Sequence, residues 1–214
     1  MGQMFPGENV TSRLPLKVFI TSVSVMGDMM SFPSPGMVIV PACMGNGLAN
    51  ANCICNQLAA NQGLTANGAI FNAWLSDAST DALCNIVGRM GMTAATNCGN
   101  YFPGKTTYVD MHNNTLFASW TDIMQGVLPS ININVMENGV VMTSAMFSVW
   151  TGTTNGGVYS GSDCTTGGTT ASWTDVSAAM GSVGDFSVIS GWTQSLTGTM
   201  TCGGVYPIYC FEQP

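Results

Sequence analysis

Eight cysteines in a chain of 214 residues place the strongest constraint on how this protein folds. They stand at Cys43, Cys53, Cys55, Cys84, Cys98, Cys164, Cys202 and Cys210. Their number is even and no Cys-x-x-Cys pair of the zinc-binding kind occurs, a pattern typical of a disulfide framework. Because disulfides persist in oxidising compartments, the cysteines predict an exported protein that acts at the cell surface or in the extracellular space.

The chain carries very little charge. Only 7% of its residues are charged, against roughly 25% in a typical domain. The net charge is -7, and the four basic residues, Arg13, Lys17, Arg89 and Lys105, are scattered. Binding to phosphates or sulfates needs clustered Lys and Arg, so this composition argues against nucleic acid and heparin-like polyanions as partners. No apolar run approaches the ~20 residues of a membrane-spanning helix, so membrane insertion is not expected.

The pattern along the chain predicts one α+β domain with one or two helices and long loops. Residues 1–16 are expected to form a linker or neck and residues 17–214 the domain. Strand-like runs and short helical segments alternate up to about residue 126, and short β runs follow up to Cys210. The expected strands are residues 17–25, 37–40, 69–75 and 106–109, and the expected helical segments are residues 52–62, 81–87 (capped by Ser79 or Thr80) and 120–126.

Several blocks of the sequence occur in a distinctive order. They are Gly63-Leu64 after Cys55, residues 71–76 (Phe-Asn-Ala-Trp-Leu-Ser), 84–87, 107–110, 116–120, 148–152, Asp163-Cys164 and 208–212. This order resembles the endostatin domain, which has a C-type-lectin-like fold. The same blocks, together with residues 17–22 (Lys-Val-Phe-Ile-Thr-Ser) and 209–213 (Tyr-Cys-Phe-Glu-Gln), are even more similar to a bacterial family of secreted domains of unknown function. The resemblance covers residues 17–213.

The resemblance implies two disulfides, Cys55–Cys210 and Cys164–Cys202. The first would tie a helix to the last strand, and the second would brace the long loop region. The four remaining cysteines lie beside or within insertions, so Cys43–Cys53 and Cys84–Cys98 are expected from proximity in the sequence alone.

The binding sites of endostatin and of sugar-binding C-type lectins have no counterpart here. The chain is acidic, and His112 is its only histidine, so neither a heparin-binding surface nor a histidine zinc site is expected. The calcium ligands of those lectins are also absent, and neither a cofactor nor a metal ion is predicted. One alternative is a calcium ion held by Asp163, Asp175 and Asp185 in the long loop region.

No catalytic motif is recognisable. His112 lies in a polar turn, no Gly-x-Ser-x-Gly elbow occurs, and an even number of cysteines leaves no free thiol expected. The sequence therefore predicts a protein that is not an enzyme. A secreted hydrolase with an unrecognised pair of carboxylates is the least favoured alternative.

The predicted function is non-enzymatic binding of a cell-surface glycan or protein by an adhesin or fibre tip. The segment before Lys17 would display the domain, and the resemblance implies a homotrimer. The ligand face is expected in the loop of residues 151–194, with residues 91–104 as an additional candidate segment. The candidate contacts are Tyr159, Asn155, Asp163, Trp192, Tyr101 and Phe102, because aromatic rings stack on sugars or peptides and Asn or Asp bind hydroxyl groups. Alternatively, Tyr159 and Trp192 close a small core of the loop, and the protein is a self-associating envelope component without a small ligand.

Overall fold

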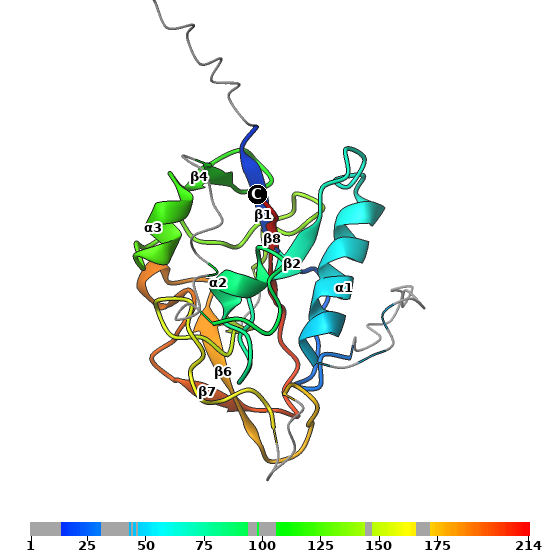
Figure 1. Ribbon diagram of the computed structural model, residues 1–214, viewed down its shortest axis with the longest axis vertical. Coiled ribbons are helices and arrows are strands. Elements are labelled where there is room, and N and C mark those ends of the chain that lie inside the picture. Colours follow the sequence, from blue (N-terminus) through cyan, green and yellow to red (C-terminus); the bar gives the residue numbers. More distant parts are fainter. Residues whose placement is uncertain are drawn as a thin grey trace, which may run out of the picture.

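A five-stranded mixed sheet forms the centre of the protein in this computed structural model, which describes residues 14–30, 43, 45, 47–93, 98, 106–143, 147–165 and 172–214. Its strand order is β2-β8-β1-β3-β4. The strands are β1 (Leu16–Ile20), β2 (Phe71–Ala73), β3 (Tyr108–Val109), β4 (Thr115–Phe117) and β8 (Tyr209–Glu212). β1 pairs in parallel with β3 and antiparallel with β8, so the first and last strands of the domain lie side by side (Figure 1).

The helix α1 (Gly47–Asn61) packs beside β2 and closes that edge of the sheet (Figure 1). The side chain of Asn56 donates to the carbonyl of Phe71 and accepts from its amide, both at 2.8 Å, and Asn52 Oδ1 accepts from the amide of Ala73 at 2.9 Å. Open sheet edges invite pairing with another chain. Two asparagines one helical turn apart therefore satisfy the backbone groups of this edge strand.

A second, three-stranded antiparallel sheet has the order β5-β6-β7. It consists of β5 (Ser148–Trp150), β6 (Met180–Asp185) and β7 (Thr199–Thr201), and the short 3-10 helix η3 (Ile189–Gly191) lies in the connection from β6 to β7. The amide of Trp150 donates to the carbonyl of Pro207 at 3.0 Å, which joins this sheet to the chain entering β8. Two further short helices, α2 (Ala82–Asn85) and α3 (Trp120–Met124), cover the first sheet.

All five tryptophans are buried. Trp74, Trp120, Trp150, Trp173 and Trp192 are each at most 4% exposed. Large aromatic side chains contribute most of the buried apolar surface of a core, so these residues organise the packing between the sheets. The string Ser-Trp-Thr-Asp occurs twice in the sequence, at residues 119–122 and 172–175, and its two tryptophans occupy separate core positions.

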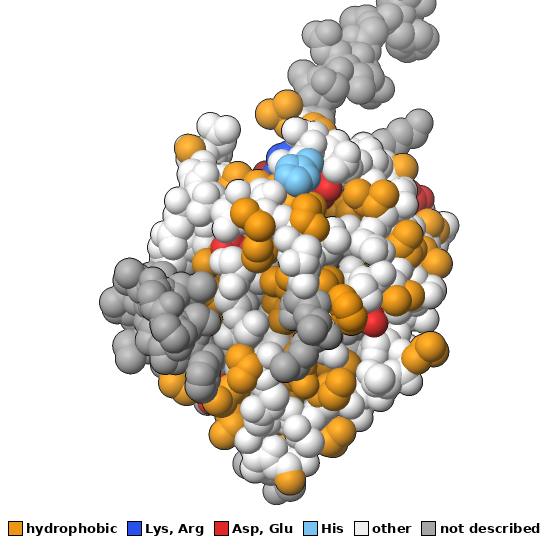
Figure 2. All heavy atoms as spheres, turned by 180° about the vertical axis from the view of Figure 1, so that it is seen from behind, with side chains coloured by type: hydrophobic (Ala, Val, Ile, Leu, Met, Phe, Trp, Pro, Cys, Tyr) orange, Lys and Arg blue, Asp and Glu red, His pale blue; other side chains and the backbone are white. Residues whose placement is uncertain are grey.

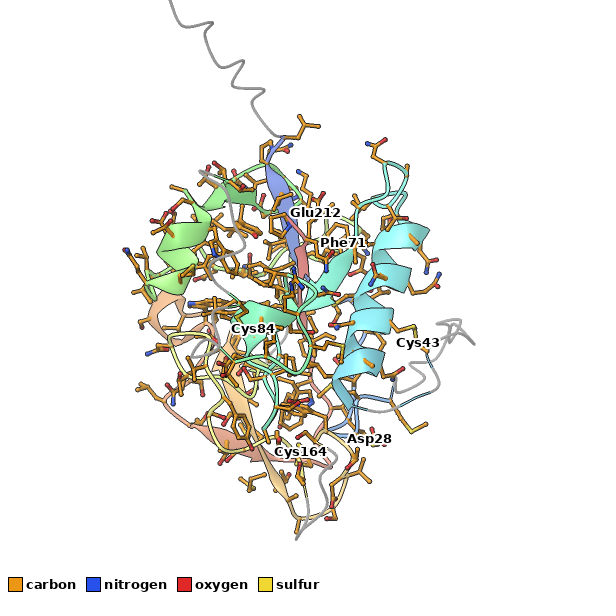
Figure 3. The ribbon with its side chains drawn as sticks, viewed as in Figure 1. Asp28, Cys43, Phe71, Cys84, Cys164 and Glu212 are labelled. Carbon is orange, nitrogen blue, oxygen red and sulfur yellow. A yellow bond between two sulfur atoms is a disulfide. The ribbon has the colours of Figure 1, made fainter. Side chains whose placement is uncertain are left out.

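The structure contains four disulfides, in the pairs that the sequence analysis expected: Cys43–Cys53, Cys55–Cys210, Cys84–Cys98 and Cys164–Cys202. Cys43, Cys84 and Cys164, labelled in Figure 3, belong to three of them and lie in different parts of the molecule. The fourth, Cys55–Cys210, joins α1 to the central strand β8 and is completely buried. The framework thus braces the whole domain.

The predicted mixed α+β class is confirmed, and the boundaries of several elements differ. The predicted strand over residues 17–25 ends at Ile20, after which Val25 makes an isolated bridge to Tyr206. The predicted helix over residues 52–62 already begins at Gly47. The residues 37–40 and most of the expected linker lie outside the described part of the chain.

The cap predicted for the second helix is wrong. Asp81, rather than Ser79 or Thr80, stands at the N-cap of α2, and the hydroxyl of Ser76 accepts from the amide of Ala82 at 2.8 Å. None of the helices in the described ranges has the length and apolar character needed to cross a membrane.

The surface is poor in charge, as the composition requires. Figure 2 shows one face on which uncharged polar atoms and hydrophobic side chains predominate and red or blue side chains are sparse. Two basic residues, Lys17 and Arg89, fall within the described part of the chain. The Nζ atom of Lys17 donates to Asn113 Oδ1 at 2.6 Å, beside the start of β1.

Candidate functional site

A surface pocket of about 580 Å³ lies within the loop region that was predicted to bind a ligand. Its walls come from a hairpin over residues 153–159 and from residues 185–198, which leave β6 and return across it. In Figure 1 these are the yellow and orange segments below α3. The described residues that line the pocket are Asn155, Asp185, Val188, Ser190, Gly191, Gln194, Ser195, Leu196, Thr197 and Gly198.

The hairpin presents Asn155 at its tip. Its turn is closed by the amide of Gly157, which donates to the carbonyl of Thr154 at 3.0 Å, and by the amide of Thr154, which donates to the carbonyl of Val158 at 2.8 Å. Gly157 has φ +70°, and a Cβ atom there would lie 2.7 Å from Leu83 and 2.9 Å from Trp74. A left-handed backbone in such close contact favours glycine. The turn is therefore held rigidly against the core.

Residues 185–198 form the opposite wall. Hydrogen bonds to the core and to β6 hold this segment in place. The buried Thr193 accepts at its hydroxyl from Trp74 Nε1 at 2.7 Å, and its carbonyl accepts from the hydroxyl of Thr151 at 2.7 Å. The amide of Ser195 donates to the carbonyl of Val183 in β6 at 2.8 Å. These bonds give the pocket a preformed shape, as expected of a ligand site.

Trp192 lies in the core and not on the ligand face, so its predicted role as a ligand contact is wrong. It is 4% exposed, and its ring centroid lies 4.9 Å from that of Trp74, 5.5 Å from Phe117 and 5.8 Å from Tyr209. Burial among several rings stabilises a tryptophan more than exposure to solvent does. The alternative assignment, closure of a core beneath the loop, describes its position.

Four polar groups in the pocket keep free hydrogen-bonding capacity. The side chains of Asn155, Ser190 and Gln194 are exposed and receive no hydrogen bond from the described residues. Asp185 Oδ1 accepts from the amide and hydroxyl of Ser187, at 2.8 and 2.6 Å, which fixes the carboxylate and leaves Oδ2 without a partner in the described structure. This set can bind hydroxyl, amide or ammonium groups.

Tyr159 and Asp163 lie close together on another side of the same hairpin. The amide of Tyr159 donates to Asp81 Oδ1 at 2.7 Å. Asp163 is 4% exposed. Its Oδ1 accepts from the hydroxyl of Thr165 at 2.7 Å, whereas its Oδ2 has no hydrogen-bond partner among the described residues. Burial raises the pKa of the Tyr159 hydroxyl to about 12, and the negative charge of Asp163 adds to the effect. Of the predicted ligand residues that the structure describes, only Asn155 lines the pocket.

The titration of Tyr159 can be predicted from these neighbours. In the folded protein its hydroxyl is expected to ionise near pH 12 instead of 10. The folded state then holds the proton more tightly than the unfolded state, so the stabilisation from this group is complete below pH 10 and is lost as the pH rises through 12. Ultraviolet absorbance during a pH titration, compared with Tyr159→Phe to assign the step, measures it. Asp163→Asn is expected to bring the step part of the way back toward 10, and an unchanged step would contradict the contribution of Asp163.

The calcium alternative is wrong for the described residues. No three His, Cys, Asp or Glu side chains in the described ranges lie close enough to hold a metal ion, so Asp163, Asp175 and Asp185 do not meet. The carboxylates of Asp175 and Asp185 instead accept hydrogen bonds from Ser177 and Ser187, two residues further along the chain. Tyr101 and Phe102 lie outside the described residues.

Sequence reasoning missed the part of the pocket formed by residues 195–198, since the predicted ligand loop ended at Gln194. Leu196, which is fully exposed, is the most prominent of these residues. The only local signal is the Thr197-Gly198 pair that precedes β7, where Gly198 has φ +74°. A turn was therefore predictable at this point, but its position beside Asn155 depends on contacts distant in sequence.

No protein-family model matches the chain, and no curated protein matches it with significant similarity. The function therefore has to be argued from the pocket and its surroundings.

Proposed function

We propose that this protein is an extracellular, non-enzymatic binding domain whose ligand site is the pocket between the 153–159 hairpin and residues 185–198. The observation that carries the proposal is the convergence of free polar groups from Asn155, Asp185, Ser190 and Gln194 on a preformed wall. Ligand sites combine a shaped cavity with a few polar groups that fix orientation. The ligand would be a cell-surface glycan or protein.

Support for an extracellular location comes from the four disulfides, which persist in oxidising compartments. The resemblance to endostatin and C-type-lectin-like domains adds to it, because such domains are extracellular and bind through long loops. The start of β1 and the end of β8 lie together at one end of the domain, whereas the segments that form the pocket, residues 153–159 and 185–198, lie below α3 (Figure 1). A display segment before Lys17 would therefore leave the pocket accessible.

A hydrolytic role is less well supported than binding. Glycoside hydrolases place two carboxylates about 5–10 Å apart across a cleft. The described residues that line this pocket include one carboxylate, that of Asp185. His112, the only histidine, lies on the surface and donates from Nε2 to the carbonyl of Gly139 at 2.8 Å. We therefore favour binding without chemical conversion.

Binding of the folded protein to arrays of glycans and of cell-surface and matrix proteins tests the proposal. We expect reproducible binding that the double variant Asn155→Ala/Gln194→Ala loses by at least about tenfold, because both exposed amides would be removed from the pocket. Neither side chain holds the fold together, so thermal stability should not change. Gln62→Ala, an exposed change just beyond the end of α1, serves as the matched control.

A clean blank on both arrays would contradict the proposal and favour the structural alternative, in which the protein self-associates. Sedimentation analysis of the purified domain separates these outcomes, since self-association depends on protein concentration. A homotrimer, which the resemblance implies, would give a single species of three times the monomer mass.

A further inference from the structure

Exposed aliphatic side chains occur in the pocket and in the neighbouring segment 127–131, and we call them the apolar rim: Val127, Leu128, Ile131, Val188 and Leu196. Each is at least 36% exposed, and Leu196 is completely so. Isolated exposed aliphatic residues are ordinary, but a group of them around a pocket is typical of an interaction surface. In Figure 2, hydrophobic side chains also gather along the right-hand flank, the side that carries α3 in this reversed view.

Contacts between distant segments bring the apolar rim together. A Cβ atom on Gly126 would lie 3.3 Å from the carbonyl oxygen of Asn155, so the chain carrying Val127 and Leu128 adjoins the hairpin tip. Asn132 Nδ2 donates to the carbonyl of Ser187 at 3.0 Å, so the chain that follows Ile131 adjoins the chain that precedes Val188. Val188 and Leu196 line the pocket directly. The segment that carries Val127, Leu128 and Ile131 therefore adjoins both segments that form the pocket.

The pocket also holds a negative charge that no described residue compensates. Asp185 Oδ1 is occupied by Ser187, whereas Oδ2 has no partner among the described residues. Neither of the two basic residues in the described ranges, Lys17 and Arg89, lines the pocket. On the other side of the hairpin, the carboxylates of Asp77, Asp81 and Asp163 lie near Tyr159. An anionic ligand would be repelled here, and a cationic group would be attracted.

We propose that the pocket binds a lysine or arginine side chain of a partner polypeptide, with Asp185 Oδ2 as its counter-ion and the apolar rim packed on aliphatic side chains next to that residue. The amides of Asn155 and Gln194 would bond the partner's backbone, which offers both donors and acceptors. This inference rests on the proposed function and selects a polypeptide over a glycan. No aromatic ring is among the described residues that line the pocket, whereas sugar sites commonly use one as a stacking platform.

The experiment is an NMR titration of the isotope-labelled protein with the blocked tripeptide Leu-Lys-Leu and, separately, with Leu-Gln-Leu. We expect the lysine peptide to shift the backbone amides of residues 185–198 and of Asn155, and to bind about three- to fivefold more tightly than the glutamine peptide, as for a partly exposed ion pair. Added salt should reduce this preference.

Two variants isolate the two parts of the site. Asp185→Asn keeps an acceptor for Ser187 and therefore the local turn, but it should abolish the preference for lysine over glutamine. Leu196→Ser alters an exposed side chain and should weaken both peptides equally. Equal binding of both peptides to the unaltered protein, or binding that Asp185→Asn does not change, would overturn the inference.

A further titration with neutral methyl glycosides distinguishes this inference from the proposed function. If glycosides shift the residues of the pocket and neither peptide does, the pocket is a ligand site for sugars and only the inference fails. If neither peptides nor glycosides shift these residues and both arrays are blank, the inference and the proposed function fail together.

Discussion

Replacing Cys55 and Cys210 together by alanine is expected to lower the free energy of unfolding more than removal of any other disulfide in this protein. The bond spans 155 residues, whereas the other three span 38, 14 and 10. On the chain-entropy model its removal costs about 5 kcal/mol, against about 2.7 kcal/mol for Cys43–Cys53. Alanine is the appropriate substitute because both cysteines are buried and alanine adds no polar group at either position.

Thermal unfolding under non-reducing conditions measures the difference. For a domain of this size, 5 kcal/mol corresponds to a decrease in Tm of about 10–20 °C. The matched control is Cys43→Ala/Cys53→Ala, which should lower Tm by about half as much. Equal losses for the two pairs would show that loop length does not govern the stabilisation.

A single methyl group at Gly184 is expected to disrupt the wall of the pocket. A Cβ atom at this position in β6 would lie 2.0 Å from the carbonyl oxygen of Trp192 and 3.1 Å from the Cα atom of Thr193. Both are backbone atoms, and Thr193 is held in place by Trp74 and Thr151. Residues 192–193 would have to move away from the sheet, so Gly184→Ala should cost about 3 kcal/mol or more.

Gly156→Ala is the control for this prediction. No atom lies within 4 Å of its Cβ position and its φ is outside the left-handed region, so this variant should be neutral or slightly stabilised. Denaturant unfolding of both variants, with binding to the arrays as a second readout, tests the prediction. Similar stability of Gly184→Ala and Gly156→Ala would mean that residues 192–193 do not lie against β6 as described.

Helix ends that are set by nearby residues in the sequence agree best with the structure. The end of α1 was expected at Gln62 and lies at Asn61, because Gly63 provides the left-handed residue that stops a helix, with φ +72°. The start of the same helix was placed five residues too late. The amide of Gly47 donates to the carbonyl of Trp173 at 2.9 Å and to that of Asp28 at 3.3 Å, so contacts distant in sequence determine where the helix begins.

The ligand residues show the same division. The amide of Asn155 in a long loop predicts a ligand contact, and Asn155 does line a pocket, because a polar residue at the tip of a glycine-rich turn stays exposed. The aromatic ring of Trp192 also predicts a ligand contact, but a ring is equally suited to a core. The residues next to Trp192 in the sequence do not indicate that Trp74, Phe117 and Tyr209 surround it.

Composition and local pattern already specify a disulfide-braced α+β domain of low charge, with a long loop region before its last strand. These properties follow from composition and local pattern, and they do not require knowledge of which segments meet. In the folded protein, by contrast, Trp192 and Asp163 are buried, and Asn155, Asp185 and Gln194 come together in one pocket. The order of residues along a loop does not specify these features, because burial and pocket formation depend on contacts between residues far apart in the chain.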